Sequence, residues 1–141
     1  MKQVLFAAAI FSASIGSAFA SPASDAQTHF AAIGSGDMAV LMRPYADNAQ
    51  LNWVGGPLDG AYAGADNIRG TWEKFLKAAG PLKVSIGSIE ESANPKGGTV
   101  VANVLFEGKS MIKVRYVLTY RDNKLVNETW QIDPKLSVAG Y

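Results

Sequence analysis

The stretch IGSGDMAVLMRPYADNAQLNWVGGPLDGAYAGADNIRGTWEKF, residues 33–75, decides the fold of this chain. The glycines at 34 and 36 predict a helix end, and Asp37 predicts the N-cap of a second short helix. Pro44 predicts where that helix stops, because proline donates no backbone hydrogen bond. Residues 50–54 alternate between polar and apolar side chains, as a half-buried strand does. The stretch therefore predicts helix, short helix and strand in close succession.

Helices are predicted on both sides of this strand. Upstream, Ser24 predicts the N-cap of a helix that runs to about Gly34. Downstream, turn residues 55–60 and a short return strand at 61–63 lead into a helix over 66–79, with Asp66 or Asn67 as its cap. This last helix has an apolar face at helical spacing, formed by Ile68, Trp72, Phe75, Leu76 and Ala79.

The rest of the chain predicts four long strands, over residues 82–92, 99–107, 110–120 and 125–132, with turn residues between them. A group of helices followed by a run of antiparallel strands indicates an α+β fold, in which helices cover one face of a curved sheet. The third of these strands, residues 110–120, indicates which face of the sheet points toward the helices. Its Tyr116 face is expected to point inward, because the opposite choice would bury Lys113 and Arg115. The same reasoning places Trp130 inward, and Glu128 with it.

The motifs G-D at 36–37, Y-A-D at 45–47 and G-A-D-N-I at 64–68 resemble the nuclear transport factor 2-like superfamily, which includes SnoaL-like domains and ketosteroid isomerases. The resemblance covers residues 27–134. It implies a cone in which three N-terminal helices pack on a curved antiparallel β-sheet around one deep pocket. Many unrelated chemistries use such a fold, so function has to be argued from the pocket.

The resemblance also aligns three positions with the catalytic residues of ketosteroid isomerases. The isomerase tyrosine falls on His29, the general-base aspartate on Trp53 and the protonated aspartate on Tyr116. All three differ from the isomerase pattern. A general base must lie within hydrogen-bonding reach of the proton it removes, and Trp53 supplies no base. Isomerase chemistry of the usual kind is therefore not expected.

His29 and Glu128 each admit two interpretations. His29 is either an acid–base group at the pocket mouth, coupled to Glu128 or Tyr116, or a surface or partly buried side chain bonded to backbone. Glu128 is either an inward carboxylate suited to proton chemistry, or a partner of Arg69 or Arg115, or exposed at the strand end. The candidate catalytic residues are accordingly His29, Tyr116 and Glu128.

A dispersed aromatic set predicts either the lining of a cavity for a flat ligand or a solid core. Its indole N–H and phenol O–H groups need partners when buried, which favours a cavity. The chain is therefore expected to bind a small apolar or aromatic molecule. The alternatives are a cofactor-free isomerase, cyclase or dehydratase that uses His29, and a dimerising module with a filled cone. The candidate ligand-binding residues are Trp53, Tyr62, Trp72, Tyr116 and Trp130.

The first twenty residues predict a signal peptide, with Lys2, an apolar run from Val4 and a small-x-small cleavage site at 18–20. Residues 21–141 would form the domain, in the periplasm or outside the cell. The chain has 13 basic and 12 acidic residues. Loss of Lys2 with the signal peptide would leave equal numbers of the two. The sequence has no run of basic residues, so a nucleic-acid partner is not expected.

Composition limits the remaining partners. The chain has no cysteine and one histidine, so neither a metal nor another cofactor is expected. The outer sheet face mixes apolar and charged side chains, and a homodimer through it is predicted.

Overall fold

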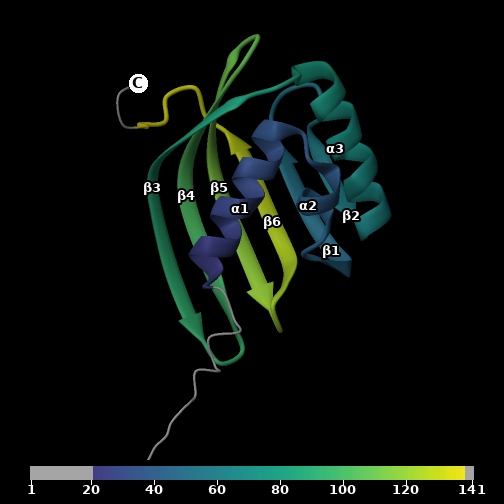
Figure 1. Ribbon diagram of the computed structural model, residues 1–141, viewed down its shortest axis with the longest axis vertical. Helices are drawn as coiled ribbons and strands as arrows, with labels where there is room; N and C mark the ends of the chain where they lie inside the picture. Colours follow the sequence, from purple (N-terminus) through teal and green to yellow (C-terminus); the bar gives the residue numbers. More distant parts are fainter. Residues whose placement is uncertain (1–20, 139–141) are drawn as a thin grey trace, which may run out of the picture.

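A computed structural model describes residues 21–138 of the chain. They form six strands in one sheet, in the order β2-β1-β6-β5-β4-β3, with helices on its concave side (Figure 1). The α+β class is confirmed. The predicted signal peptide and its cleavage site after Ala20 lie outside the described residues.

The two helices before the first strand have local capping signals. α1 spans Pro22–Ser35, and Ser21 caps it by accepting a hydrogen bond from the Ser24 amide at 3.1 Å. The cap lies three residues earlier than predicted, because proline suits the first turn of a helix. α2 spans Met38–Met42, and its predicted cap is confirmed: Asp37 accepts from the Val40 amide at 3.2 Å.

The first strand is longer than the alternating residues 50–54 predict. β1 spans Tyr45–Val54, and it pairs with the short strand β2, Gly60–Ala63. The pairing of β1 with β6 (Lys124–Ile132) shifts register between Tyr45 and Gln50. This irregularity interrupts the alternation of buried and exposed side chains, so the first half of the strand has no simple period. α3 follows as Ala65–Ala79, with Gly64 as its N-cap instead of Asp66 or Asn67.

The remaining strands form the predicted meander: β3 (Lys83–Asn94), β4 (Gly97–Glu107), β5 (Met111–Arg121) and then β6. The sheet is mixed, however, and not purely antiparallel. β6 lies antiparallel to β5 and parallel to β1, with Trp53 opposite Trp130. Parallel neighbours need a long connection, and here the connection contains α3 and four strands. The three helices are also not all N-terminal, since α3 follows β2.

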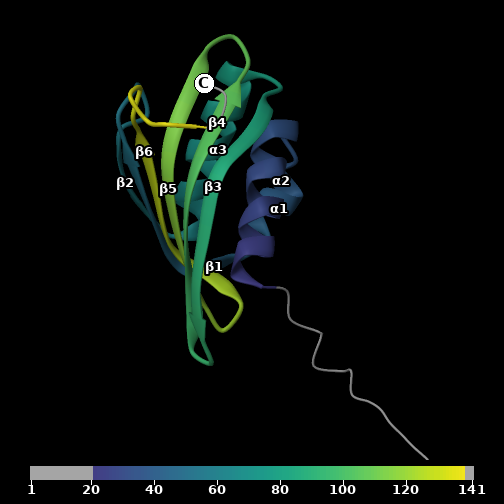
Figure 2. The same cartoon turned by 90° about the vertical axis from the view of Figure 1, so that its left-hand side faces the viewer.

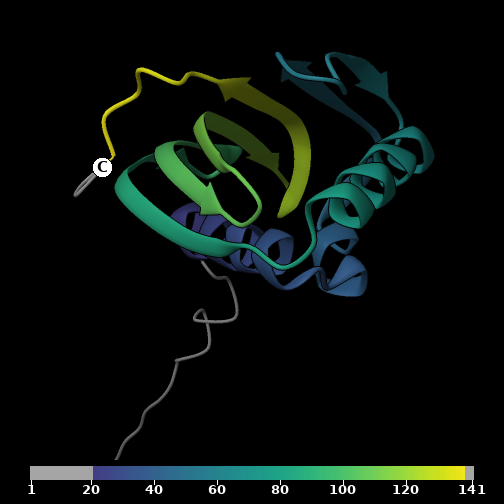
Figure 3. The same ribbon diagram turned by 90° about the horizontal axis from the view of Figure 1, so that it is seen from above.

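The sheet curves around the helices (Figure 3). α1 contacts β3 and β4, whereas α3 contacts β1 and β2. The predicted orientation of β5 is confirmed: Val114, Tyr116 and Leu118 are fully buried, and Arg115 is exposed. Glu128 and Trp130 of β6 also point into the core, as predicted.

The convex face of the sheet is partly covered by the chain itself. After β6, residues 133–138 turn back across this face toward β4 (Figure 2). Asn103 donates its side-chain amide to the Ser137 carbonyl at 3.1 Å, and Val138 and Leu105 are both buried. None of the described helices is long and apolar enough to cross a membrane.

Gly34 offers a test of the contact between α1 and β3. A Cβ there would lie 2.6 Å from Val84 Cγ2 and 2.7 Å from the Leu82 carbonyl oxygen. The backbone cannot yield easily, because the Gly34 carbonyl accepts from the Leu82 amide at 2.9 Å. We expect Gly34→Ala to lower the free energy of unfolding by roughly 1–3 kcal/mol, measured by urea denaturation.

Gly70→Ala is the matched control. Gly70 also lies in a helix, but a Cβ there would meet nothing within 4 Å. This variant should be stabilised by about 0.5–1 kcal/mol, because alanine loses less backbone entropy than glycine in a helix. Equal effects of the two substitutions would contradict the predicted clash at Gly34.

Candidate functional site

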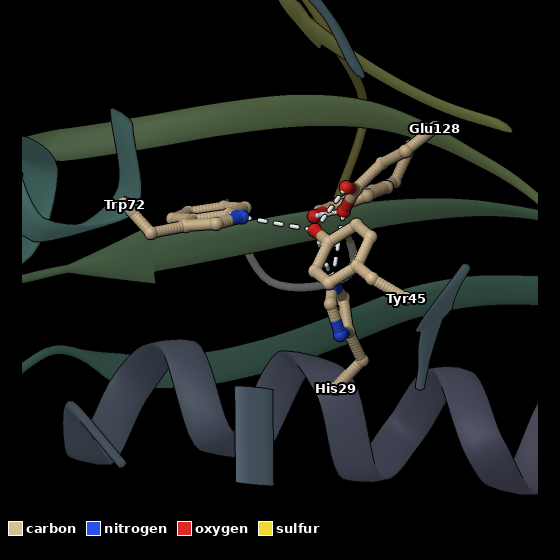
Figure 4. A network of polar contacts seen from close by, with 5 residues as sticks. His29, Tyr45, Trp72 and Glu128 are labelled. Carbon is tan, nitrogen blue, oxygen red and sulfur yellow. Dashed lines mark hydrogen bonds and ion pairs between the residues drawn. The ribbon is translucent and has the colours of Figure 1, made fainter. Parts of the chain in front are cut away.

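Five polar or aromatic side chains meet inside the cone, and we call them the buried cluster: His29, Tyr45, Trp72, Tyr116 and Glu128. They come from α1, β1, α3, β5 and β6, so segments far apart in the sequence meet at one point (Figure 4). His29 and Glu128 are each 1% exposed. The cluster is thus shielded from solvent on every side.

Glu128 is the acceptor at the centre of the cluster. His29 Nε2 lies 2.8 Å from Oε2, which also accepts from the Tyr116 hydroxyl, while Oε1 accepts from the Tyr45 hydroxyl. Tyr45 in turn accepts from Trp72 Nε1 at 2.9 Å. A buried carboxylate is costly unless hydrogen bonds satisfy it, and both oxygens here have partners. With Glu128 ionised, Nε2 is the protonated nitrogen of His29, because a carboxylate only accepts.

The tyrosines of the cluster are held in their neutral form. Burial raises the pKa of Tyr45 and of Tyr116 well above the usual range, and the nearby Glu128 carboxylate raises both further. Burial and then Glu128 also raise the pKa of Tyr120, which lies on the same face of β5. Each hydroxyl therefore stays protonated and able to donate over the physiological pH range.

The described part of the chain shows neither a backbone-bonded His29 nor a Glu128 that is exposed or paired with arginine. His29 is bonded to Glu128 and not to backbone, and Glu128 forms no ion pair with Arg69 or Arg115 within residues 21–138. Arg115 donates to Asn103 Oδ1 at 2.8 Å on the opposite face of the sheet. The reason is that β6 lies between β1 and β5, so its inward side chains reach the middle of the cone.

Tyr45 belongs to the cluster, and sequence reasoning did not select it as a site residue. In the sequence it stands out only as part of the Y-A-D motif. A signal was available: counting back by twos from Trp53 places Tyr45 on the inward face of the strand. The register shift after Tyr45 weakens that signal, since Asp47 lies on the same count and is exposed.

The predicted aromatic set fills the centre of the cone. Trp72, Tyr116 and Trp130 are fully buried, and Trp53 stacks on Trp130 with ring centroids 4.6 Å apart. Phe106 stacks on the other side, with its centroid 5.1 Å from that of Trp130. Tyr62 is half-buried, and its hydroxyl donates to the Leu58 carbonyl at 2.6 Å.

A cavity of about 690 Å³ lies at the open end of the cone, where α3 ends and β4 turns into β5. This is the upper end of the molecule in Figure 1. Of the five predicted ligand-binding residues, only Trp53 lines it, and His29, Tyr116 and Glu128 do not. Its lining residues are Trp53, Pro57, Leu58, Lys74, Phe75, Ala78, Ala79, Leu82, Lys109, Ser110, Met111, Ile112, Lys113, Ile132 and Pro134.

The chemical capacity of the two sites differs. The buried cluster holds donors and acceptors but is closed, whereas the cavity is open and mostly apolar. Neither is a metal centre: within residues 21–138, no group of three or more His, Asp or Glu side chains is arranged to hold an ion. Of these two sites, the cavity has room for an organic ligand, since pockets for small molecules are typically 300–1,000 Å³.

Comparison with solved structures supports the fold. An NTF2-like protein of unknown function from Pseudomonas putida KT2440 superposes with a TM-score of 0.68 at 15% identity, covering 77% of this chain and 81% of that one. A protein with a cystatin-like fold from Caulobacter vibrioides gives 0.65 at 16% identity, covering 79% and 87%. A putative polyketide cyclase from Sinorhizobium meliloti gives 0.56 at 19% identity, covering 77% and 94%.

Sequence comparison gives the family. None of the curated proteins compared matches the chain. The family model of the SnoaL-like domain matches residues 26–128, from within α1 to Glu128. The predicted superfamily is confirmed by this match together with the NTF2-like structures. The chain belongs to the SnoaL-like domain family, within the nuclear transport factor 2-like superfamily.

Proposed function

We propose that this protein binds a small, largely apolar molecule in the cavity at the open end of the cone, without transforming it. The observation that carries the proposal is the separation of the two sites. The cavity has the volume and apolar lining of a ligand site, and the predicted catalytic residues His29, Tyr116 and Glu128 do not line it. Binding would thus use Phe75, Ile112 and Ile132 more than the aromatic centre.

The buried cluster supports this proposal by acting as part of the core. Its hydrogen bonds join α1, β1, α3, β5 and β6, and every one of its members is closed off from solvent. Leaving a buried polar group without its hydrogen-bond partner typically costs about 1–3 kcal/mol. Such a cluster holds the elements of the cone in register around the cavity.

Acid–base catalysis is the second candidate function. One observation favours it: His29, Tyr116 and Glu128, the three predicted catalytic residues, lie in direct contact. Packed rings join the cavity lining to the cluster: the lining residue Trp53 contacts Trp72, with ring centroids 5.2 Å apart, and stacks on Trp130. Catalysis would therefore need these rings to move.

Export and assembly stay predictions. Cleavage after Ala20 would release residues 21–141 into the periplasm or the medium. A homodimer through the outer sheet face would have to use the area that residues 133–138 leave uncovered, because this segment already lies against β4.

The cavity can be tested with N-phenylnaphthylamine, an uncharged probe whose fluorescence rises in apolar surroundings. We expect the probe to bind the native protein. Ala78→Phe should weaken binding at least about tenfold, a loss of about 1.4 kcal/mol, because Ala78 lines the cavity and is exposed. Ala31→Phe is the control, since Ala31 is an exposed helical alanine outside the cavity. Equal binding by both variants would place the probe elsewhere.

His29 gives a second readout, because it is the only histidine in the chain. Its ring signals in an NMR spectrum need no assignment. We expect them to stay in place when N-phenylnaphthylamine fills the cavity, since His29 does not line it. A large shift of the His29 signals, absent in Ala78→Phe, would favour the catalytic candidate.

The burial of the tyrosines predicts how stability depends on pH. Because their pKa is raised in the folded state, the unfolded chain loses these protons first as the pH rises above the ordinary tyrosine pKa of about 10. Stability is therefore complete below that pH and falls above it. Tyr116→Phe should reduce the downward slope by about 1.4 kcal/mol per pH unit, measured by urea denaturation at successive alkaline pH values. An unchanged slope would show that Tyr116 ionises equally in both states.

A further inference from the structure

We infer that the ligand of the open-end cavity is an amphipathic anion, with one apolar chain or ring system and one carboxylate, sulfate or phosphate group. This inference rests on the proposed function and names the chemical class of its ligand. It starts from the charges around the cavity. Three of the lining residues are lysines, and none of the described lining residues is acidic.

The lysines come from three separate segments that meet at this end of the cone. Lys74 lies on α3, Lys109 in the turn between β4 and β5, and Lys113 on β5. Lys74 and Lys109 are exposed and Lys113 is half-buried. Within residues 21–138, none of them has a carboxylate partner within 4.0 Å. An anion at the mouth would therefore meet positive charge that the protein has not already neutralised.

Lys109 places one ammonium group firmly at the mouth. Its Nζ donates to the carbonyl of Ala78, itself a lining residue, at 3.1 Å. This bond joins the β4–β5 turn to the last turn of α3. An ammonium has three donors, and the described structure uses one of them here. The carbonyl end of α3 carries partial negative charge, and Lys109 offsets it where it would otherwise repel an anion.

Acidic residues adjoin lining residues in the sequence: Glu73 is next to Lys74 and Asp133 is next to Ile132, and neither of these two lines the cavity. Asp133 lies between the lining residues Ile132 and Pro134, but it is not a lining residue itself. Its Oδ1 accepts from the Lys135 amide at 3.0 Å, so it is engaged in its own turn.

The apolar lining completes the amphipathic pattern. Phe75 and Leu82 are buried, while Met111 at the turn is 54% exposed and is one of three large exposed hydrophobic residues of the described chain. Apolar surface thus lies deep and ammonium groups lie toward solvent. A flexible methionine at the edge suits a chain of variable shape.

Dodecanoate and dodecanol are the probes, because they share one alkyl chain and differ in charge. Both would displace N-phenylnaphthylamine from the native protein, with dodecanoate kept below its micelle-forming concentration. We expect dodecanoate to bind at least about tenfold more tightly than dodecanol. The preference should shrink as salt is added, since screening weakens exposed charges.

The decisive variant replaces all three lining lysines, Lys74→Met, Lys109→Met and Lys113→Met, which keeps their apolar stems. It should bind dodecanol as the native protein does and lose the preference for dodecanoate. The matched control carries Lys77→Met, Lys96→Met and Lys124→Met. These lysines are exposed and do not line the cavity, so the net charge changes equally. This control should keep the preference.

The outcomes separate this inference from the function on which it rests. If N-phenylnaphthylamine and dodecanol bind but dodecanoate has no advantage, the anionic class is wrong and the apolar site stands. If none of the three binds, the proposed function itself fails. Equal loss in both lysine variants would reduce the effect to net charge and overturn the inference. Lysine-dependent cosedimentation with phosphatidylglycerol vesicles, without binding of dodecanoate, would also overturn it in favour of a membrane headgroup.

Discussion

The hydrogen-bonded carboxylate of Glu128 is the constraint on which the rest of this structure depends. It lies at the centre of the cone with almost no exposure to solvent, and it is tolerated there because His29, Tyr45 and Tyr116 surround it. Those three residues come from three different elements. Trp72 adds a fourth element through Tyr45. Hydrogen bonds centred on one buried carboxyl group thus link α1, α3 and the inner strands.

The filled centre explains why the cavity lies where it does. Trp53, Phe106 and Trp130 stack in the middle of the cone, and the cavity opens at the end where α3 stops. Many folds of this kind carry their function in side chains added to a common frame. In this protein the buried cluster lies inside the cone, and the apolar cavity, with lysines among its lining residues, opens to solvent.

The family match indicates the fold of the protein. Its function has to be inferred from the residues of the site. The NTF2-like protein from Pseudomonas putida superposes on this chain at 15% identity, because a curved sheet packed on helices tolerates many cores. A cluster of His29, Tyr116 and Glu128 invites comparison with an enzyme. Its burial, and the absence of its residues from the cavity lining, favour binding instead.

The sequence by itself determined the elements, the α+β class and the inward faces of β5 and β6, because these follow from capping residues and from the period of two along a strand. It also singled out His29, Tyr116 and Glu128. It did not determine the parallel pairing of β1 with β6, the bond between His29 and Glu128, or the place of Tyr45. Those depend on contacts between residues far apart in the chain. The cavity belongs with them, since whether Trp53 and Trp130 line a pocket or fill a core is a matter of how their rings pack, and only the tertiary structure decided that they stack.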